Sequence, residues 1–570
     1  MQAAPKYKQV NPHLKYGWDP GGGILPIEST KWFDATRYFL ASTRWVVLII
    51  LWGITVFWWL PRICPETHLF AGVEPLAVCI RIFASAFIFY SLYHLTALTL
   101  AIVRGQPRSS VPLKEEVDVP VGVIYTVCDD FQESASETLV DQEYKRFHVY
   151  ICDDSQNPEI KERIDRFHSA NRAKTTIIRR QVNVGFKAGN INHALQTGLI
   201  TEPLVLVVDA DEKLGTQFLI SLVAEFVNSE ASFLQASHRA VQPSITRFQR
   251  ILCPSVAVYW RVYEQARNFD GFPLVLGHGV LLPRLLISKL GWFDENMTSE
   301  DIEFSYKIAS NAKVGRGCVS SRTWAFEEVP LSLQRYRSRF CRWLRQDLVL
   351  GLLVLPKVLS RTPHLSFSER FDLFVKQFHI PVCGLVLPYL VMLAILFLLS
   401  GVSSDLAETR PTHAEKCILI AVGLIVSIAP SLPVLFLAQT KPLKRVSCAA
   451  ASIWLFNSLI VASGLALAHV FVHFSDAKFV PTGCAESSRE EGASARVLLP
   501  YLAIVLLAGL ASCALLGSMS LAAIATVLSA RKLRCIANCA AAILLVVGLL
   551  QLSASPMHVL ALLVLGTFRY

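Results

Sequence analysis

Long apolar runs lie near both ends of this chain, whereas its middle has the mixed polarity of a domain folded in water. A helix needs about twenty residues to cross the hydrocarbon core of a bilayer. The pattern therefore predicts seven membrane spans, at 43–60, 77–103, 378–401, 417–438, 448–472, 497–528 and 535–552. The first run starts too far from the N-terminus for a cleaved signal peptide and lacks a small-residue cleavage pattern.

The basic residues of the short loops favour one orientation. They lie before the first span and after the second, fourth and sixth, whereas the loops at 403–416 and 473–496 carry acidic residues. Because Lys and Arg favour the cytoplasmic side, the sequence predicts a cytoplasmic N-terminus and middle domain. The chain is 53% hydrophobic and 17% charged, which is typical of a membrane protein. Its formal net charge of +10 is attributed to basic residues on the cytoplasmic side that face the membrane. We therefore expect no nucleic acid as a partner.

Two of the fourteen cysteines, Cys64 and Cys484, lie in predicted outward loops. We hypothesise a disulfide between them if that side of the membrane is oxidising. The cysteines form no CxxC motif and no zinc-like spacing, so buried thiols are expected elsewhere.

Between about 118 and 330, β-branched runs such as VPVGVIYTV, FHVYICDD and LVLVVDA alternate with amphipathic stretches. This alternation predicts a largely parallel sheet with helices on both faces. In such sheets ligands bind beyond the carboxyl ends of the strands. Acidic pairs follow three of these ends, and they are Asp129 with Asp130, Asp153 with Asp154, and Asp209 with Asp211.

One acidic pair alone would fit a turn or a helix N-cap, but three at equivalent strand ends favour a shared purpose. Clustered carboxylates repel each other unless a cation lies among them. Mg2+ and Mn2+ bind one or two carboxylates together with phosphate oxygens. Asp209 and Asp211 are therefore predicted to hold Mg2+ or Mn2+, and the ion is predicted to hold a nucleotide diphosphate.

Six segments carry a family resemblance: VIYTVCDD, VYICDDS, GFKAGNINHAL, VVDADEKL, SEDIEFSYKI and RFCRW. In their order and spacing the chain resembles the membrane-embedded family 2 glycosyltransferases, the group that holds cellulose, chitin, hyaluronan and curdlan synthases. The resemblance covers the whole chain. It implies a multi-span α-helical membrane protein with an inserted cytoplasmic α/β GT-A (Rossmann-like) glycosyltransferase domain. The expected parts are a cytoplasmic segment 1–42, two spans in 43–103, a catalytic domain 104–330, interface helices 331–377 and about five spans in 378–570.

The resemblance implies a group of residues that contact the nucleotide. Asp154 or its neighbour Asp153 would accept a hydrogen bond from uracil, and the others would lie near the nucleotide and its diphosphate: Asp130, Lys187, Asn190, Asp209 and Arg339. Asp209 and Asp211 correspond to the family's DxD pair, with Asp211 as the more direct metal ligand. Lys187 suits a phosphate, and its alternative interpretation is a solvated loop lysine.

The resemblance also implies the catalytic group. Glu300 and Asp301 stand where the family has Thr-Glu-Asp, and Asp301 is expected to be the general base that deprotonates the acceptor hydroxyl. The alternative for Asp301 is a helix cap. Arg342 and Trp343 match the family's Gln-x-x-Arg-Trp, in which Arg342 would neutralise the leaving diphosphate and Trp343 would stack on the acceptor sugar. Arg339 replaces the Gln that processive synthases mostly keep.

Gly277, His278 and Gln235 lie where relatives contact the acceptor, with packing as their alternative role. The expected function is that of a processive, inverting synthase that polymerises a UDP-sugar into a β-linked polysaccharide and translocates it across the membrane. UDP-glucose is the favoured donor and a β-glucan the favoured product. Its partners would be the UDP-sugar, the growing polysaccharide and the bilayer, with a homo-oligomer as an open option. The alternatives are a non-processive glycolipid synthase, which Arg339 favours, and a transporter with an inactive domain.

Overall fold

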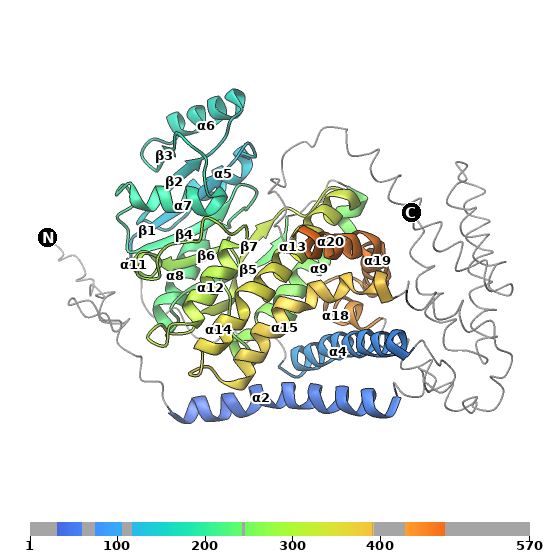
Figure 1. Ribbon diagram of the computed structural model, residues 1–570. Helices are drawn as coiled ribbons and strands as arrows, with labels where there is room; N and C mark the ends of the chain where they lie inside the picture. The colour runs from blue at the N-terminus through green and yellow to red at the C-terminus, as the bar shows by residue number, and fades with distance from the viewer. Residues whose placement is uncertain are drawn as a thin grey trace, which may run out of the picture.

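The computed structural model describes residues 31–59, 74–104, 117–241, 246–389, 392 and 428–473. Within these ranges a seven-stranded sheet forms the centre of one α/β domain, and longer helices lie beside it (Figure 1). The predicted spans 497–528 and 535–552, the second part of 378–401 and the first half of 417–438 lie outside the described residues, as do Cys64 and Cys484.

The sheet is mixed. Its strands are β1 (Val121–Val127), β2 (Phe147–Asp153), β3 (Thr175–Arg179), β4 (Leu204–Asp209), β5 (Leu234–Ala240), β6 (Val280–Pro283) and β7 (Cys318–Glu327). They lie in the order β3-β2-β1-β4-β6-β5-β7. All neighbours are parallel except β6, which runs antiparallel to both β4 and β5. The predicted parallel sheet is therefore interrupted by one short reversed strand.

Both faces of the sheet are buried, as continuous apolar strands require. Along β4, Val205 and Val207 join one core and Leu206 and Val208 join the other, because successive side chains point to opposite faces. The first core includes residues of α7 (Phe186–Gln196) and α12 (Glu300–Ala309). The second includes residues of α5 (Glu133–Val140), α6 (Pro158–Ala170) and α8 (Phe218–Asn228).

Several helices connect the sheet to the apolar parts of the chain. After β5 come α9 (Arg247–Tyr259), the π-helix η3 (Trp260–Glu264) and α10 (Arg267–Asp270), and after β6 comes α11 (Arg284–Lys289). After β7 come α13 (Leu333–Leu353), α14 (Leu355–Arg361) and α15 (Phe367–Gly384). Capping boxes at Thr246 and Ser366 begin α9 and α15, satisfying backbone N–H groups that have no partner inside the helix.

The predicted span 448–472 is not one helix. It is divided between α19 (Pro442–Ser458) and α20 (Ile460–His473), which follow η4 (Ala429–Ser431) and α18 (Leu432–Leu437). The two helices pack against different partners, because α19 lies against α9 and α18 whereas α20 packs on α13 and α15 (Figure 1). Leu344 of α13 and Leu467 of α20 belong to one buried cluster.

The two N-terminal helices lie side by side and pack along the helices that adjoin the sheet domain (Figure 1). They are α2 (Lys31–Ile54), continued by the π-helix η1 (Thr55–Trp59), and α4 (Glu74–Arg104). Arg44 of α2 forms a buried 2.7 Å ion pair with Asp270. In the described part of the chain, one helix, Arg81–Val103, is long and apolar enough to cross a membrane, and Thr43–Trp58 is a shorter apolar helix.

Candidate active site

A cavity of about 830 Å³ opens beyond the carboxyl ends of β1, β2 and β4 and extends between the helices. It brings together most of the residues that the sequence singled out. Its lining includes Asp130, Asp154, Lys187, Asn190, Asp209, Asp211, Gly277, His278, Glu300, Asp301, Arg339, Arg342 and Trp343. Asp153 and Gln235 do not belong to this lining.

The strand-end carboxylates meet because β2, β1 and β4 are adjacent and parallel. The Tyr125 hydroxyl of β1 donates to the Ala210 carbonyl at 2.9 Å and so fixes the turn that carries Asp209 and Asp211. Burial raises the pKa of Asp130 to about 7. Burial, and then the charge of Asp209, raises the pKa of Asp211 to about 7. Both carboxyls are therefore harder to ionise than an aspartate in water.

Asp153 and Asp154 have different partners. Asp153 is buried and forms a 2.7 Å ion pair with Arg179 of β3. Asp154 faces the cavity and accepts two hydrogen bonds from Arg180, at 2.7 and 2.6 Å. The nearby Asp129 accepts backbone N–H groups from the β2–α6 loop at 2.8 Å and joins the ends of β1 and β2.

The start of α7 aims a lysine at the DxD pair. The ammonium of Lys187 donates to Asp209 and, at 2.7 Å, to the Gly277 carbonyl. Asn190 faces back into the fold and donates to the Cys152 carbonyl at 2.8 Å. A side chain at Gly189 would place its Cβ 2.1 Å from the Val184 carbonyl oxygen, so this tight entry into the helix requires glycine.

The two carboxyls predicted for catalysis begin α12. Asp301 lies in the first turn and accepts the Ile302 backbone N–H at 2.8 Å. Burial raises the pKa of Asp301 and raises that of Glu300 to about 8, with the charge of Asp301 as the second cause for Glu300. Gln346 of α13 donates to the Thr298 carbonyl at 3.1 Å. The loop before Asp301 is thereby bonded to the helix that carries RFCRW.

The RFCRW element lies on α13 and faces the same cavity. The guanidinium of Arg339 lies over the Trp343 ring, 4.8 Å from its centroid, in a cation–π contact. Burial, and then the charge of Arg339, lowers the pKa of Arg342. Two clustered guanidiniums in a partly dry site provide positive charge opposite the carboxylates of β4 and α12.

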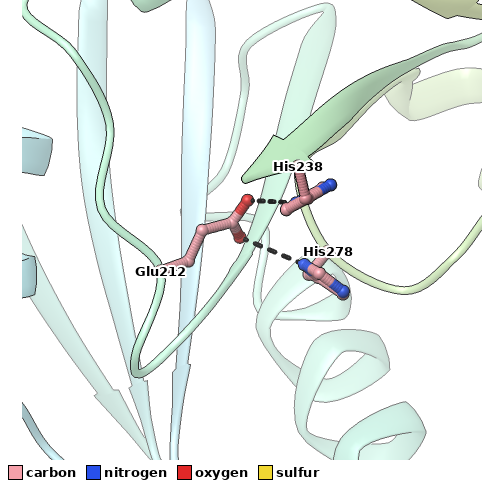
Figure 2. Close-up of side chains that lie close together, drawn as sticks. All are labelled: Glu212, His238 and His278. Carbon is pink, nitrogen blue, oxygen red and sulfur yellow. Dashed lines mark hydrogen bonds and ion pairs between the residues drawn. The ribbon is translucent and has the colours of Figure 1, made fainter. Parts of the chain in front are cut away.

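His278 belongs to a compact group with Glu212 and His238 (Figure 2). Glu212 follows the DxD pair and is fully buried, and its carboxylate oxygens point toward the two imidazole rings (Figure 2). Burial would raise the pKa of Glu212, but the two histidines hold it below its usual range. Burial opposes a charge on His278, yet the neighbouring Glu212 carboxylate raises the pKa of His278 to about 10.

Three functional candidates were missed by sequence reasoning, and they are Arg180, Glu212 and Glu327. Arg180 follows β3 directly, a position that could have been noticed beside the three acidic strand ends. Glu212 is the next residue after Asp211, but its partners lie 26 and 66 residues away. Glu327 ends β7 within an ordinary turn-like sequence, so only the fold brings it to the cavity.

The DxD segment fits a divalent cation. Asp209 and Asp211 lie on one turn facing the cavity, and one positive group, Lys187, already bonds Asp209. The half-buried Asp211 carboxyl, with its raised pKa, would lose its proton readily to a bound cation. Two carboxylate ligands with room for phosphate oxygens suit Mg2+ or Mn2+.

The fold and site define a mixed α/β sheet domain with a carboxylate-lined cavity. Residues 204–438 match the family model described as "Glycosyl transferase family group 2". This similarity to family 2 glycosyltransferases extends from β4 to the residue after α18.

Solved structures give more distant likenesses. The mannosyltransferase PcManGT from Pyrobaculum calidifontis, in complex with GDP-Man and Mn2+, is 16% identical over 70% of this chain and 99% of its own, with a TM-score of 0.45. S. aureus TarS 1–349 is 13% identical over 63% and 94%, with a TM-score of 0.30. GalNAc-T7 with UDP, GalNAc and Mn2+ is 12% identical over 37% and 43%, with a TM-score of 0.29. No curated protein matches the chain.

Proposed function

We propose that this protein is an integral membrane, inverting hexosyltransferase that uses a UDP-sugar and Mg2+ or Mn2+ to extend a β-linked polysaccharide, best a β-glucan made from UDP-glucose. One observation carries the proposal. A single cavity contains the DxD pair, Asp301 and Arg342, and continues into a chamber lined by aromatic residues of α4, α9 and α19. Donor, base and acceptor path are therefore contiguous.

The chemistry follows from the placement of charges. A metal ion bound at the DxD pair would supply positive charge to the diphosphate. Asp301 would take the proton of the acceptor hydroxyl as that oxygen attacks the anomeric carbon from the face opposite the diphosphate, which inverts the configuration. Arg342 would stabilise the negative charge that develops on the departing UDP, in a buried setting where such an interaction is strong.

The deeper chamber supports a sugar chain as acceptor. Tyr90 of α4, Tyr259 of α9 and Phe456 of α19 line it, and aromatic faces suit the C–H faces of sugars. Tyr90 and Phe456 are stacked with their centroids 6.3 Å apart. The chamber lies next to α4, the helix long enough to cross a bilayer, so a product leaving through it would enter the membrane region and be translocated.

The surface of α2 supports a membrane location. Val46, Ile50, Ile54 and Phe57 are exposed at helical spacing, Phe57 to 84%. The opposite side of the helix buries Trp45 and Leu48 against Tyr93. A helix that packs with one face and exposes a continuous apolar stripe on the other is expected to contact lipid.

A glycolipid product is the second candidate, and Arg339 favours it. Its guanidinium covers one face of the Trp343 ring, so one face remains for an acceptor. The chamber also contains aliphatic residues, Leu252, Val434 and Leu455 among them, which would suit a lipid tail.

The test is a product assay on the purified full-length protein in nanodiscs with labelled UDP-glucose, UDP-GlcNAc or UDP-galactose and Mg2+ or Mn2+. High-molecular-weight labelled material that a β-glucanase degrades would support the synthase. Label confined to a small lipid-extractable species would replace it with the glycolipid enzyme. Absence of transfer and of sugar-nucleotide binding with all three donors would overturn the proposal.

A further inference from the structure

The loop 276–279 is fixed from two sides. On the cavity side, Lys187 donates to the Gly277 carbonyl at 2.7 Å. On the inner side, the fully buried Gln235 side chain donates to the His278 carbonyl at 2.7 Å and accepts the Leu276 N–H at 3.0 Å. Side-chain hydrogen bonds that satisfy a loop backbone hold it in one conformation. His278 is therefore presented to the cavity by a rigid loop.

Gly279 brings this loop directly onto two buried side chains. Its φ is +59°, and a Cβ there would lie 2.7 Å from Glu212 Oε1 and 2.8 Å from His238 Nε2. Glu212 and His238 are themselves joined at 2.8 Å. Glycine is thus needed both for its backbone conformation and for the close approach, and the pair beneath supports the loop.

His278 lies between two carboxylates. Its Nδ1 is 3.8 Å from Glu212 Oε2, and its Nε2 is 4.0 Å from Glu327 Oε2. Both separations are too long for a direct hydrogen bond. An oxygen atom placed beside both groups would lie within hydrogen-bonding distance of each. Among the described residues the structure records no hydrogen bond to the Glu327 carboxylate.

The same three side chains in Figure 2 have ligand atoms within 4.8 Å of one another and resemble a metal site. The hydrogen bonding of the His238 ring argues against a bound metal ion. Its Nδ1 is buried and has no hydrogen-bond partner in the described structure, whereas a metal-bound histidine almost always donates its other N–H to a partner. A His238 that donates through Nε2 to Glu212 leaves only a lone pair unpaired, which costs less than a buried N–H.

We propose that His278 and Glu327 bind one hydroxyl group of a sugar in the active site, and that Glu212 is a positioning residue that holds His278 for this contact. The imidazole N–H at Nε2 donates to the hydroxyl oxygen, and the hydroxyl proton is donated to Glu327. This inference rests on the proposed function, since it assumes a sugar substrate, and it identifies the side chains that select among sugars.

A paired donor and acceptor is a strong means of selection. A hydroxyl that is absent or points the other way leaves two partly buried polar groups unpaired, and such sites reject the wrong analogue better than an apolar pocket does. The hydroxyl belongs either to the transferred sugar or to the acceptor sugar, and binding measurements distinguish the two.

The experiment compares wild type with Glu327→Ala, His278→Ala and the double variant, all full-length in nanodiscs with Mn2+. The Kd of UDP and of UDP-glucose, or of the donor found active, is measured with the acceptor KM. If the hydroxyl is the donor's, each single variant raises the Kd of UDP-glucose about tenfold and leaves that of UDP unchanged. If it is the acceptor's, the acceptor KM rises by that factor instead. The double variant should lose no more than either single variant, because both groups bind one hydroxyl.

Glu225→Gln is the matched control, because Glu225 is a partly buried carboxylate that bonds Ser320 of the same strand β7 outside the cavity. It should change neither constant. Fully additive losses in the double variant, or unchanged donor and acceptor constants in both single variants, would overturn the inference while transfer by the wild type upholds the proposed function. A wild type that neither binds nor turns over any of the sugar nucleotides would count against the proposed function itself.

Discussion

The two halves of the sheet build their shares of the cavity in different ways. In the half formed by β2, β1 and β4, parallel neighbours bring Asp154, Asp130 and Asp209 together simply because each acid follows its strand. In the half formed by β6, β5 and β7, the functional groups come from a loop, a strand end and the first turn of α12. The first half is therefore specified locally, whereas the second depends on packing between distant segments.

This difference predicts different responses to mutation. Changes in the nucleotide half should act on binding of UDP and metal, because its carboxylates and Lys187 face the DxD turn. Changes in the other half should act on transfer, sugar selection or pH dependence while UDP still binds. Variants of single residues test whether the two halves act separately.

The largest effect is expected for Asp301→Asn. A positioned general base contributes about 10² to 10⁴ in rate, so kcat should fall about a thousandfold while the Kd of UDP-sugar stays within about twofold. Steady-state transfer and equilibrium binding measure the two quantities. Asp294→Asn, which alters a carboxyl that bonds Asn296 outside the cavity, serves as the control. Near wild-type turnover by Asp301→Asn would show that another group is the base.

A smaller but large effect is expected for Asp211→Ala. Loss of one of two carboxylate ligands should weaken Mn2+-dependent binding of UDP about a hundredfold. Binding of UDP to wild type in EDTA should weaken to a similar level. Calorimetric titration with and without Mn2+ checks both statements. An affinity that is the same in Asp211→Ala and wild type with Mn2+ would remove the DxD interpretation.

Gly189→Ala tests whether the nucleotide half depends on its backbone. The added Cβ would meet the Val184 carbonyl oxygen at 2.1 Å, so the start of α7 must shift and Lys187 must move with it. Overpacking of this kind costs about 1–3 kcal/mol, seen as a lower thermal midpoint and weaker UDP binding. Gly215→Ala is the control, because its Cβ would meet no atom within 4 Å. Equal midpoints for the two variants would contradict this account.

The smallest effect concerns pH. Burial raises the pKa of Asp301 and of Glu300, the latter to about 8, and a protonated carboxyl cannot act as a base. The value of kcat/KM should therefore rise as the pH increases through the raised pKa of Asp301. Glu300→Gln removes the neighbouring carboxylate, so Asp301 should ionise at lower pH and the acidic limb should move downward. An unmoved limb in the pH–rate profile would separate Glu300 from the base.

The sequence was sufficient to predict the local half of the site. Buried strands followed by acids bring those acids to one edge of the sheet wherever the strands pair in parallel. The motif resemblance then extended this to Asp301 and Arg342, and the structure brings both to the cavity. Their chemical roles stay predictions until they are measured.

The remaining features depend on contacts that no local pattern records. Gln235 was predicted to contact the acceptor, but its side chain lies outside the cavity lining and bonds the loop 276–279. Asp153 and Asp154 are adjacent aspartates, and the sequence does not indicate which of them faces the cavity. In the structure they differ in their ion-pair partners, which are Arg179 for Asp153 and Arg180 for Asp154. The reversed strand β6 has four residues, too few for an alternation to be read. The apolar run 448–472 is broken at Leu459 into α19 and α20, which pack against different helices. The sequence of the run does not indicate these packing partners.

The position of Glu212 has a consequence for how such an enzyme could change its substrate. This residue is covalently next to the DxD pair and physically beneath His278, so the metal turn and the proposed sugar contact share one side chain. Gly279 leaves no space for compensation. Altering the preferred sugar through this region would therefore demand simultaneous exchanges at several positions, and randomising His278 alone should yield mostly inactive clones rather than new specificities.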